Sequence, residues 1–202
     1  MSLPKINHSN FKNLAEQNLD EFIKKENLSL GGDEFEKLSG WTNVAMNLLD
    51  AKNSLLLSKK SKQMENLSKE EEFTIANGMF KNFIMSYGKC FTSSGKGRIS
   101  LNPKEIYSTK PDLIEIHDRI MDSRNKYVAH SDEENGHDIA ISYTEENENE
   151  ITLATTYTTL IPFGLYDSFI EVIEFCEQQV ILKLNKKLDK IEDKIGKKIF
   201  FK

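Results

Sequence analysis

The 202-residue sequence contains only two cysteines and lacks any long apolar run. Cys90 and Cys176 lie far apart without a CxxC partner, which excludes a disulfide framework and a cysteine zinc site. No stretch approaches the roughly 18 apolar residues of a membrane-spanning helix, and the first residues lack the apolar segment of a signal peptide. These absences predict a cytoplasmic protein with no membrane partner.

Acidic residues slightly outnumber basic ones, and the charge is unevenly placed. The net charge of −5 argues against indiscriminate binding to nucleic acid, although a local basic site is compatible with it. Residues 132–150 contain eight acidic side chains and no Lys or Arg, whereas residues 183–202 contain eight Lys and three acidic side chains. With 38% hydrophobic residues, the composition predicts one globular domain over residues 1–202.

Apolar residues spaced by three and four predict about five helices. The sequence Ser68-Lys69-Glu70-Glu71 is a capping box, which strengthens the predicted start of the third helix. The Lys/Ser-rich stretch 58–67 is interpreted as a loop or frayed helix end. The predicted helices cover about 9–26, Asp33 to about Leu57, Ser68 to about Cys90-Phe91, about Pro111 to about His130, and about 30 residues from Pro162.

Between the last two predicted helices the hydrophobic period changes from about 3.6 to two. The alternating residues are Ile139, Ile141 and Tyr143, followed after an acidic turn by Ile151, Leu153, Thr155 and Tyr157. This pattern predicts a two-stranded hairpin at about 138–160. The expected fold is therefore a mainly α helical bundle with one inserted β-hairpin.

The fourth predicted helix places two polar residues on its apolar side. On a helical wheel centred on Arg124, seven neighbouring apolar or aromatic residues fall within roughly 80° of it, and His117 lies about 20° away. A charged side chain directed into a core is costly unless it is paired or opens into a polar cleft. Two interpretations follow. Either Arg124 forms an internal salt bridge and His117 is a hydrogen-bonded core histidine, or both face a cleft that binds an anion.

His130 stands at the expected end of the same helix, about 120° from Arg124 if the helix is unbroken. An imidazole at a helix C-terminus can exchange a proton near neutral pH, and a neighbouring Arg can stabilise developing phosphate charge. The two side chains converge if the helix ends near Ala129.

The sequence from Arg124 to His130, with Asn125 directly after the arginine, resembles the signature of the HEPN superfamily. That signature is an Arg, four to six arbitrary residues and a His at the end of a helix in a helical bundle. The resemblance covers roughly residues 80–132, including Tyr87-Gly88-Lys89-Cys90-Phe91 and Ser94-Gly95-Lys96 upstream.

Many HEPN proteins are metal-independent endoribonucleases of toxin–antitoxin or phage-defence systems. The resemblance therefore implies an RNA substrate, Arg124 and His130 as catalytic residues and Asn125 as a supporting residue, with His117, Lys126 and Tyr127 as further supporting candidates. It also implies a homodimer with two motifs facing one cleft, and an antitoxin or regulatory protein as a partner. Other members are non-catalytic modules that bind a protein, RNA or nucleotide, and this alternative stays open.

Two weaker patterns concern ligands. Gly95-Lys96-Gly97-Arg98 could bind phosphate through Lys96 and Arg98, but it lacks the GxxxxGK[ST] spacing of a P-loop, so a solvated loop is the favoured interpretation. Metal-capable residues lie between His130 and His137 without the spacing of a zinc or calcium site. No metal or cofactor is therefore expected.

Overall fold

The computed structural model describes residues 32–92, 98–129, 137–147, 150–159 and 161–199, together with Glu21 and Lys24. The expected fold class is confirmed: a mainly helical bundle with one two-stranded antiparallel hairpin. The predicted helix at 9–26 lies outside the described residues, except that Glu21 and Lys24 are helical. The elements in chain order are α2 (Gly32–Lys60), η1 (Ser61–Gln63), α3 (Lys69–Phe91), α4 (Pro103–Ile106), α5 (Leu113–Ala129), β1 (His137–Asn147), β2 (Glu150–Thr159), η2 (Phe163–Leu165) and α6 (Tyr166–Ile195).

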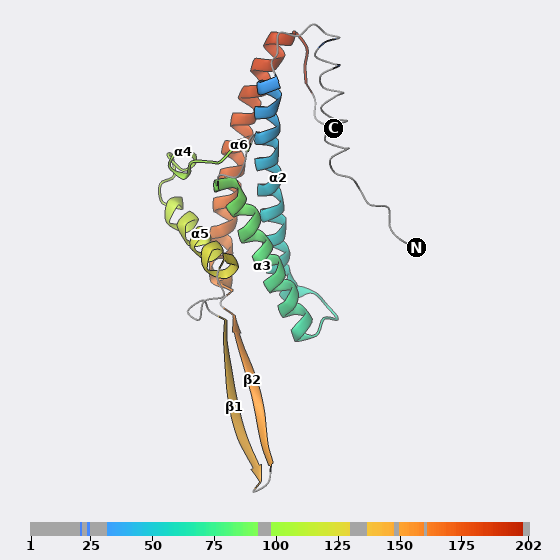
Figure 1. Ribbon diagram of the computed structural model, residues 1–202, viewed down its shortest axis with the longest axis vertical. Coiled ribbons are helices and arrows are strands. Elements are labelled where there is room, and N and C mark those ends of the chain that lie inside the picture. Colours follow the sequence, from blue (N-terminus) through green and yellow to red (C-terminus); the bar gives the residue numbers. More distant parts are fainter. Residues whose placement is uncertain are drawn as a thin grey trace, which may run out of the picture.

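Helices α2 and α6 lie side by side and antiparallel along the length of the bundle (Figure 1). Helix α3 packs mainly against α2, and α5 packs against α3 and α6. The core between them is formed by residues at helical spacing, because each helix buries one apolar stripe. Its largest fully buried side chains are Tyr87, Tyr107, Tyr166, Phe80, Phe83, Phe169, Leu48, Leu55, Ile84, Ile106, Ile120 and Ile173.

The start of α3 follows from its capping box. The Ser68 hydroxyl accepts from the Glu71 backbone N–H, and the Glu71 carboxylate accepts from the Ser68 backbone N–H. The backbone hydrogen bond from Ser68 lowers the pKa of Glu71. The helix begins and ends where the sequence predicts.

The interpretation of 58–67 as a loop or frayed end was wrong for its first residues. Helix α2 continues to Lys60, and η1 adds a further turn over Ser61–Gln63. Ser58 and Ser61 are fully buried although the stretch is polar, because their small hydroxyls are hydrogen-bonded inside the bundle.

A second difference concerns the segment before the motif helix. Asn102 caps the short helix α4, which the hydrophobic pattern does not predict, and α5 then begins at Leu113 after a turn at Lys110–Pro111. Burial of Ile106 and Tyr107 anchors this segment in the core. Helix α5 itself begins within two residues of the predicted start at about Pro111.

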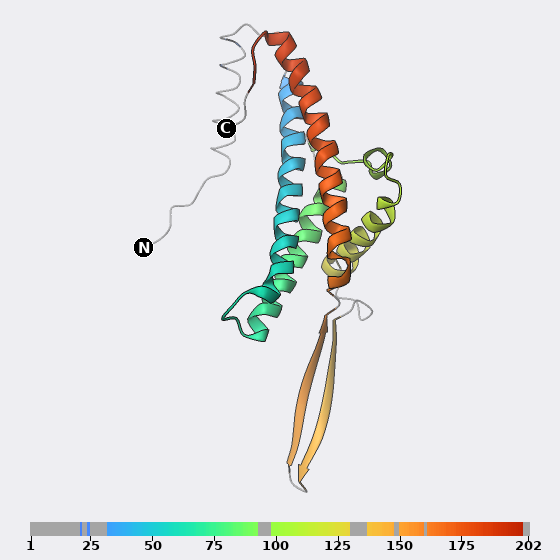
Figure 2. The same ribbon diagram turned by 180° about the vertical axis from the view of Figure 1, so that it is seen from behind.

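Strands β1 and β2 form the predicted hairpin, and their register places Ile141 opposite Thr155 and Tyr143 opposite Leu153. The hairpin projects from the end of the bundle beyond α5 and the start of α6 (Figure 2). Along the part of the chain that the structure describes, no helix combines the length and apolar character needed to cross a membrane.

Candidate functional site

Helix α5 positions the motif through a stripe of buried side chains. Leu113, His117 and Ile120 are buried against the core, and Arg124 follows them one turn later as a half-buried side chain. The wheel therefore predicted the direction of Arg124 correctly. Because Arg124 continues this stripe, its side chain points toward the last part of α3.

Arg124 lies across α3 at a glycine. A Cβ added at Gly88 would overlap Cδ of Arg124 and lie 2.8 Å from its Nε, so a residue with a side chain at this position would displace the arginine. Gly88 is buried in the middle of a helical turn, where glycine costs about 1 kcal/mol relative to alanine. The close approach of Arg124 gives a physical reason for accepting that cost.

The guanidinium has few polar partners. Its Nη1 donates to Oδ1 of the neighbouring Asn125 at 3.2 Å, while its buried Nε has no hydrogen-bond partner. Two other cations on α5 are ion-paired: Arg119 with Glu115 at 2.8 Å and Lys126 with Asp122 at 2.9 Å. No described carboxylate pairs with Arg124, so the internal salt bridge of the first interpretation is not found among the described residues. An unpaired, partly desolvated guanidinium is suited to binding an anion.

The other motif residues are placed less completely. Asn125 is exposed at the surface with its amide oxygen on Arg124. Lys126 is exposed and engaged by Asp122. The backbone of Tyr127 is part of α5, but its side chain and the whole of His130 lie outside the described residues. The structure thus brings Arg124 and Asn125 together and leaves the position of His130 as a prediction.

His117 is the end of a buried chain of hydrogen bonds. Its Nδ1 shares a 2.7 Å hydrogen bond with the Tyr87 hydroxyl, which shares a 2.8 Å hydrogen bond with the Tyr107 hydroxyl. The imidazole also lies 4.4 Å, centroid to centroid, from the ring of Phe91. Burial lowers the pKa of His117, although Asp118 acts in the opposite direction, so the neutral imidazole is favoured. This geometry is that of a hydrogen-bonded core histidine, and a supporting role in catalysis stays a prediction.

A polar pocket of about 190 Å³ lies between α2 and the end of α3. Asn43 and Asn47 of α2, Lys89 of α3, and Arg98 line it together with Val44 and Ile99. Two cations and two amides in one concave site are chemically suited to an oxyanion such as phosphate. Arg98 was a predicted phosphate-binding residue, and Lys96 lies outside the described residues.

The buried cysteines do not supply a nucleophile. Burial raises the pKa of Cys90 well above its ordinary value and that of Cys176 to about 12, so both thiols stay protonated at neutral pH. Within the described ranges, no three His, Cys, Asp or Glu side chains gather closely enough to hold a metal ion. The candidate chemistry therefore centres on Arg124.

Several residues of the site escaped sequence reasoning. Gly88 carried one usable signal, because a glycine inside a predicted helix indicates a close approach of another group. Asn43, Asn47 and Lys89 carried none, since exposed polar residues on a helix are ordinary. Only packing reveals that they line one pocket.

Comparison of the chain with protein-family models, curated proteins and solved structures gives no match. The resemblance to HEPN proteins accordingly depends on the motif residues and their helical setting. The geometry around Arg124 is an independent observation.

Proposed function

We propose that the chain is a HEPN-like endoribonuclease that cleaves RNA without a metal ion, with Arg124 and His130 as its catalytic pair. One observation carries the proposal. Arg124 is held across Gly88 with its Nε buried and unpaired, and no described carboxylate forms a salt bridge with it. A buried donor without a partner costs about 1–3 kcal/mol, which a bound phosphate oxygen would offset. A toxin–antitoxin or phage-defence setting belongs to the same proposal.

The reaction assigns one task to each residue. The ribose 2′-hydroxyl attacks the adjacent phosphorus, a new O2′–P bond forms, and the P–O5′ bond breaks to release a 5′-hydroxyl. His130 transfers a proton in this exchange, and Arg124 stabilises the extra negative charge on the phosphoryl oxygens. Asn125 holds the guanidinium through its amide oxygen. The products are a 2′,3′-cyclic phosphate and a 5′-hydroxyl end.

The test measures cleavage of labelled single-stranded RNA in the presence of EDTA. Wild-type protein should cleave, and Arg124→Ala and His130→Ala should each lose at least about two orders of magnitude in rate. Arg119→Ala is the matched control, because Arg119 is exposed on the same helix and paired with Glu115. Equal activity in all four proteins would sink the proposal.

The rival function is a non-catalytic HEPN-like module that binds a protein, RNA or nucleotide. The observation that favours it is the pocket of Asn43, Asn47, Lys89 and Arg98, which suits a phosphate group without requiring chemistry. Wild-type protein that binds a labelled nucleotide or RNA and leaves RNA intact would support this rival. Loss of that binding in Lys89→Ala, with binding retained in Lys81→Ala, would locate it at the pocket.

A further inference from the structure

The hairpin presents an apolar face to solvent. Residues paired across two antiparallel strands share a face, so Tyr143 and Leu153 lie together, with Ile141 and Ile151 on the same side. These four side chains are 60–70% exposed. They form the hairpin apolar face: Ile141, Tyr143, Ile151 and Leu153. The opposite face carries Ser142, Thr144, Thr152 and Ala154.

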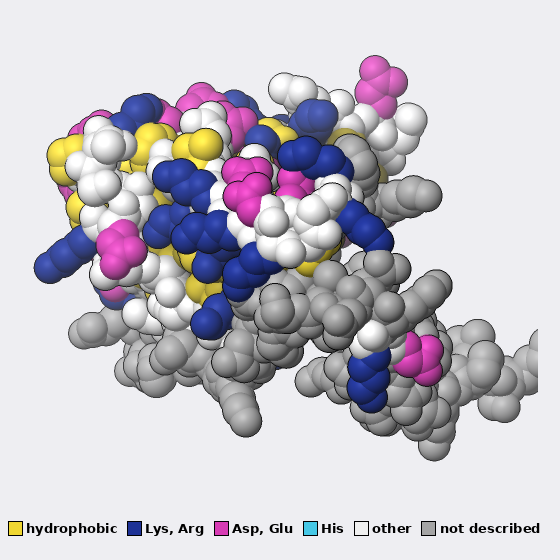
Figure 3. All heavy atoms as spheres, turned by 90° about the horizontal axis from the view of Figure 1, so that it is seen from above, with side chains coloured by type: hydrophobic (Ala, Val, Ile, Leu, Met, Phe, Trp, Pro, Cys, Tyr) yellow, Lys and Arg dark blue, Asp and Glu magenta, His cyan; other side chains and the backbone are white. Residues whose placement is uncertain are grey.

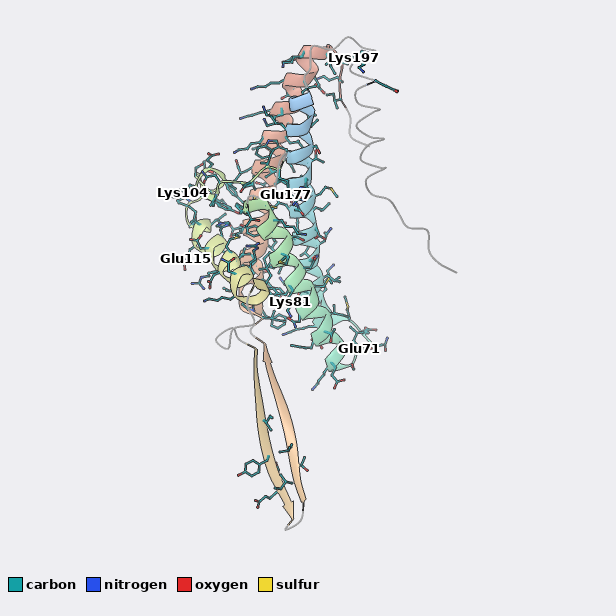
Figure 4. The ribbon with its side chains drawn as sticks, in the orientation of Figure 1. Glu71, Lys81, Lys104, Glu115, Glu177 and Lys197 are labelled. Carbon is teal, nitrogen blue, oxygen red and sulfur yellow. The ribbon has the colours of Figure 1, made fainter. Side chains whose placement is uncertain are left out.

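Nothing in the described bundle covers this face. Both views show the hairpin extending away from the helices, and Figure 4 shows its side chains standing clear of them. An isolated two-stranded hairpin is marginally stable in water and usually needs a packing partner. Contiguous exposed apolar residues on such an element indicate an interaction surface.

Charge identifies the kind of partner. The hairpin segment 137–159 contains five acidic residues and no Lys or Arg, so it repels nucleic acid and anionic surfaces. The residues from 183 onward carry a net charge of +5. These two segments lie at opposite ends of the elongated molecule (Figure 1). Figure 3 looks down on the Lys-rich end of the molecule and shows Lys and Arg side chains gathered there, with some Asp and Glu among them.

The outer side of the α2–α6 pair carries apolar side chains of its own. Lys52 of α2 is ion-paired with Glu174 and Glu177 of α6, which fixes how the two antiparallel helices face each other. From this pairing and the antiparallel run of the two helices, we infer that Leu49 and Ile181 lie on the same outer side, about one turn apart along the bundle. Both are exposed, as is Met46 one turn beyond Leu49. These three residues form the bundle apolar patch: Met46, Leu49 and Ile181.

The dimensions of the two elements match. Helix α6 has 30 residues and is about 45 Å long, and the 11-residue strand β1 is about 36 Å long. Two copies placed antiparallel over their whole length would bring each hairpin beside the second half of the other copy's α6. This arrangement would place Ile141 and Tyr143 at the level of Ile181. The acidic hairpin tip would reach the level of Lys190.

We propose that two copies of this chain form an antiparallel dimer in which each hairpin apolar face covers the bundle apolar patch of the other copy, with the acidic hairpin tip on the partner's Lys-rich end of α6. The arrangement is symmetric and closed, because each copy gives one hairpin and receives one. It depends on the hairpin and not on the ribonuclease proposal.

The area is sufficient for a stable complex. A hairpin face about 34 Å long and about 10 Å wide, covered in both copies and counted on both partners, gives a total on the order of 1,400 Å². Stable interfaces bury about 1,200–2,000 Å².

The first experiment measures the mass of the full chain in solution at micromolar concentration by sedimentation. Wild-type protein should be a dimer. The paired change Tyr143→Glu with Leu153→Glu should weaken dimerisation on the order of tenfold or more, because both residues lie in the buried face. The matched control is Thr144→Glu with Thr152→Glu, which puts two opposed glutamates on the other face of the same hairpin. A monomeric wild type, or equal loss in both variants, would overturn the proposal.

A second experiment tests the arrangement by disulfide cross-linking. In one chain the hairpin points away from the bundle apolar patch, so Tyr143→Cys combined with Ile181→Cys can cross-link only between copies. Oxidation should give a covalent dimer with this pair and much less with Thr144→Cys combined with Ile181→Cys. Efficient cross-linking of Tyr143→Cys alone would show two hairpins facing each other and would contradict the proposed arrangement.

Charge reversal supplies an independent check. Lys186→Glu, Lys187→Glu and Lys190→Glu together should weaken the dimer, and Glu145→Lys with Glu150→Lys in the same chain should restore it. The control reverses Lys69 and Lys81 on α3, away from the proposed interface. If the Lys→Glu changes weaken the dimer and the added Glu→Lys changes do not restore it, the proposed pairing of the hairpin tip with the Lys-rich end of α6 would be contradicted.

Discussion

At Gly88, the side chain of Arg124 packs directly against the backbone of α3 and occupies the space that a Cβ would need. The arginine therefore depends on a residue 36 positions earlier in the sequence for its position. Its Nε is buried without a partner, and its Nη1 is held by Asn125. A cation fixed in this way is already oriented before an anion arrives, which reduces the cost of binding.

Gly88→Ala should displace Arg124 and lower RNA cleavage more strongly than it lowers stability. The matched control is Gly78→Ala on the same helix, where a Cβ would meet nothing within 4 Å. That control should raise the free energy of unfolding by up to about 1 kcal/mol, because alanine is the better helix former. In an Arg124→Ala background the clash disappears, so Gly88→Ala should become as favourable as Gly78→Ala. A cost for Gly88→Ala that persists in that background would contradict the contact.

His117 should make stability depend on pH. Burial lowers the pKa of His117 below its ordinary value of 6.5, so below pH 6.5 the unfolded chain binds a proton that the folded chain does not. The contribution is fully present above that value and is lost as the pH falls toward the lower folded pKa. Thermal melts from neutral pH to roughly pH 5 should show this loss, with a smaller one in His117→Gln.

The control for this measurement is His137→Gln, which leaves the buried imidazole in place. It should keep the wild-type slope of stability against pH. An identical slope in His117→Gln and in the wild type would exclude the buried imidazole as its source.

At the scale of elements, α2 shows how buried hydroxyls extend a helix whose composition is polar. The Ser58 hydroxyl donates to the Ala76 carbonyl and shares a hydrogen bond with the Tyr166 hydroxyl, both at 2.7 Å. Burial raises the pKa of Tyr166 to about 12. One serine thus links α2, α3 and α6. The prediction of a loop was wrong here because a polar composition does not show whether a serine is exposed to solvent or buried.

Ser58→Ala should lower the free energy of unfolding by about 1–3 kcal/mol, because it removes the hydrogen bond to the Ala76 carbonyl and leaves the buried Tyr166 hydroxyl without its described partner. Tyr166→Phe should cost less, since Ser58 still donates to Ala76. Denaturant unfolding measures both, with Ser100→Ala at an exposed position as the control. Costs that simply add in the double variant would argue against a shared hydrogen bond.

The elements also differ in how far they could be predicted. The capping box fixed the start of α3, and the change of period located the hairpin, because both signals depend on local geometry. Helix α4 was missed because burial of Ile106 and Tyr107 holds this segment in the core, whereas α5 begins within two residues of its predicted start.

At the scale of the whole molecule, the hairpin and the bundle are separate in their packing. None of the described buried core residues comes from β1 or β2. The hairpin contributes its exposed face and its charge instead. Stability of the bundle and association of two copies should therefore be separable.

Replacing residues 138–158 with a short Gly/Ser linker should leave the helical content and the melting temperature of dilute protein nearly unchanged. The melting temperature of the full chain should rise with concentration, because association stabilises the folded state, and this rise should vanish in the shortened chain. Circular dichroism melts over a range of concentrations measure both effects. Collapse of the bundle after the replacement would contradict the separation.

The sequence by itself determined the mainly helical fold, the hairpin, and the direction of Arg124 on α5, because these follow from hydrophobic period and from residues close in the chain. Tertiary structure alone decided that Arg124 rests on Gly88 without a described carboxylate partner, that His117 is bound to Tyr87, and that Lys89 and Arg98 share a pocket with two asparagines. Those contacts join residues from different helices, and helical spacing determines which side a residue faces, not which residue it meets.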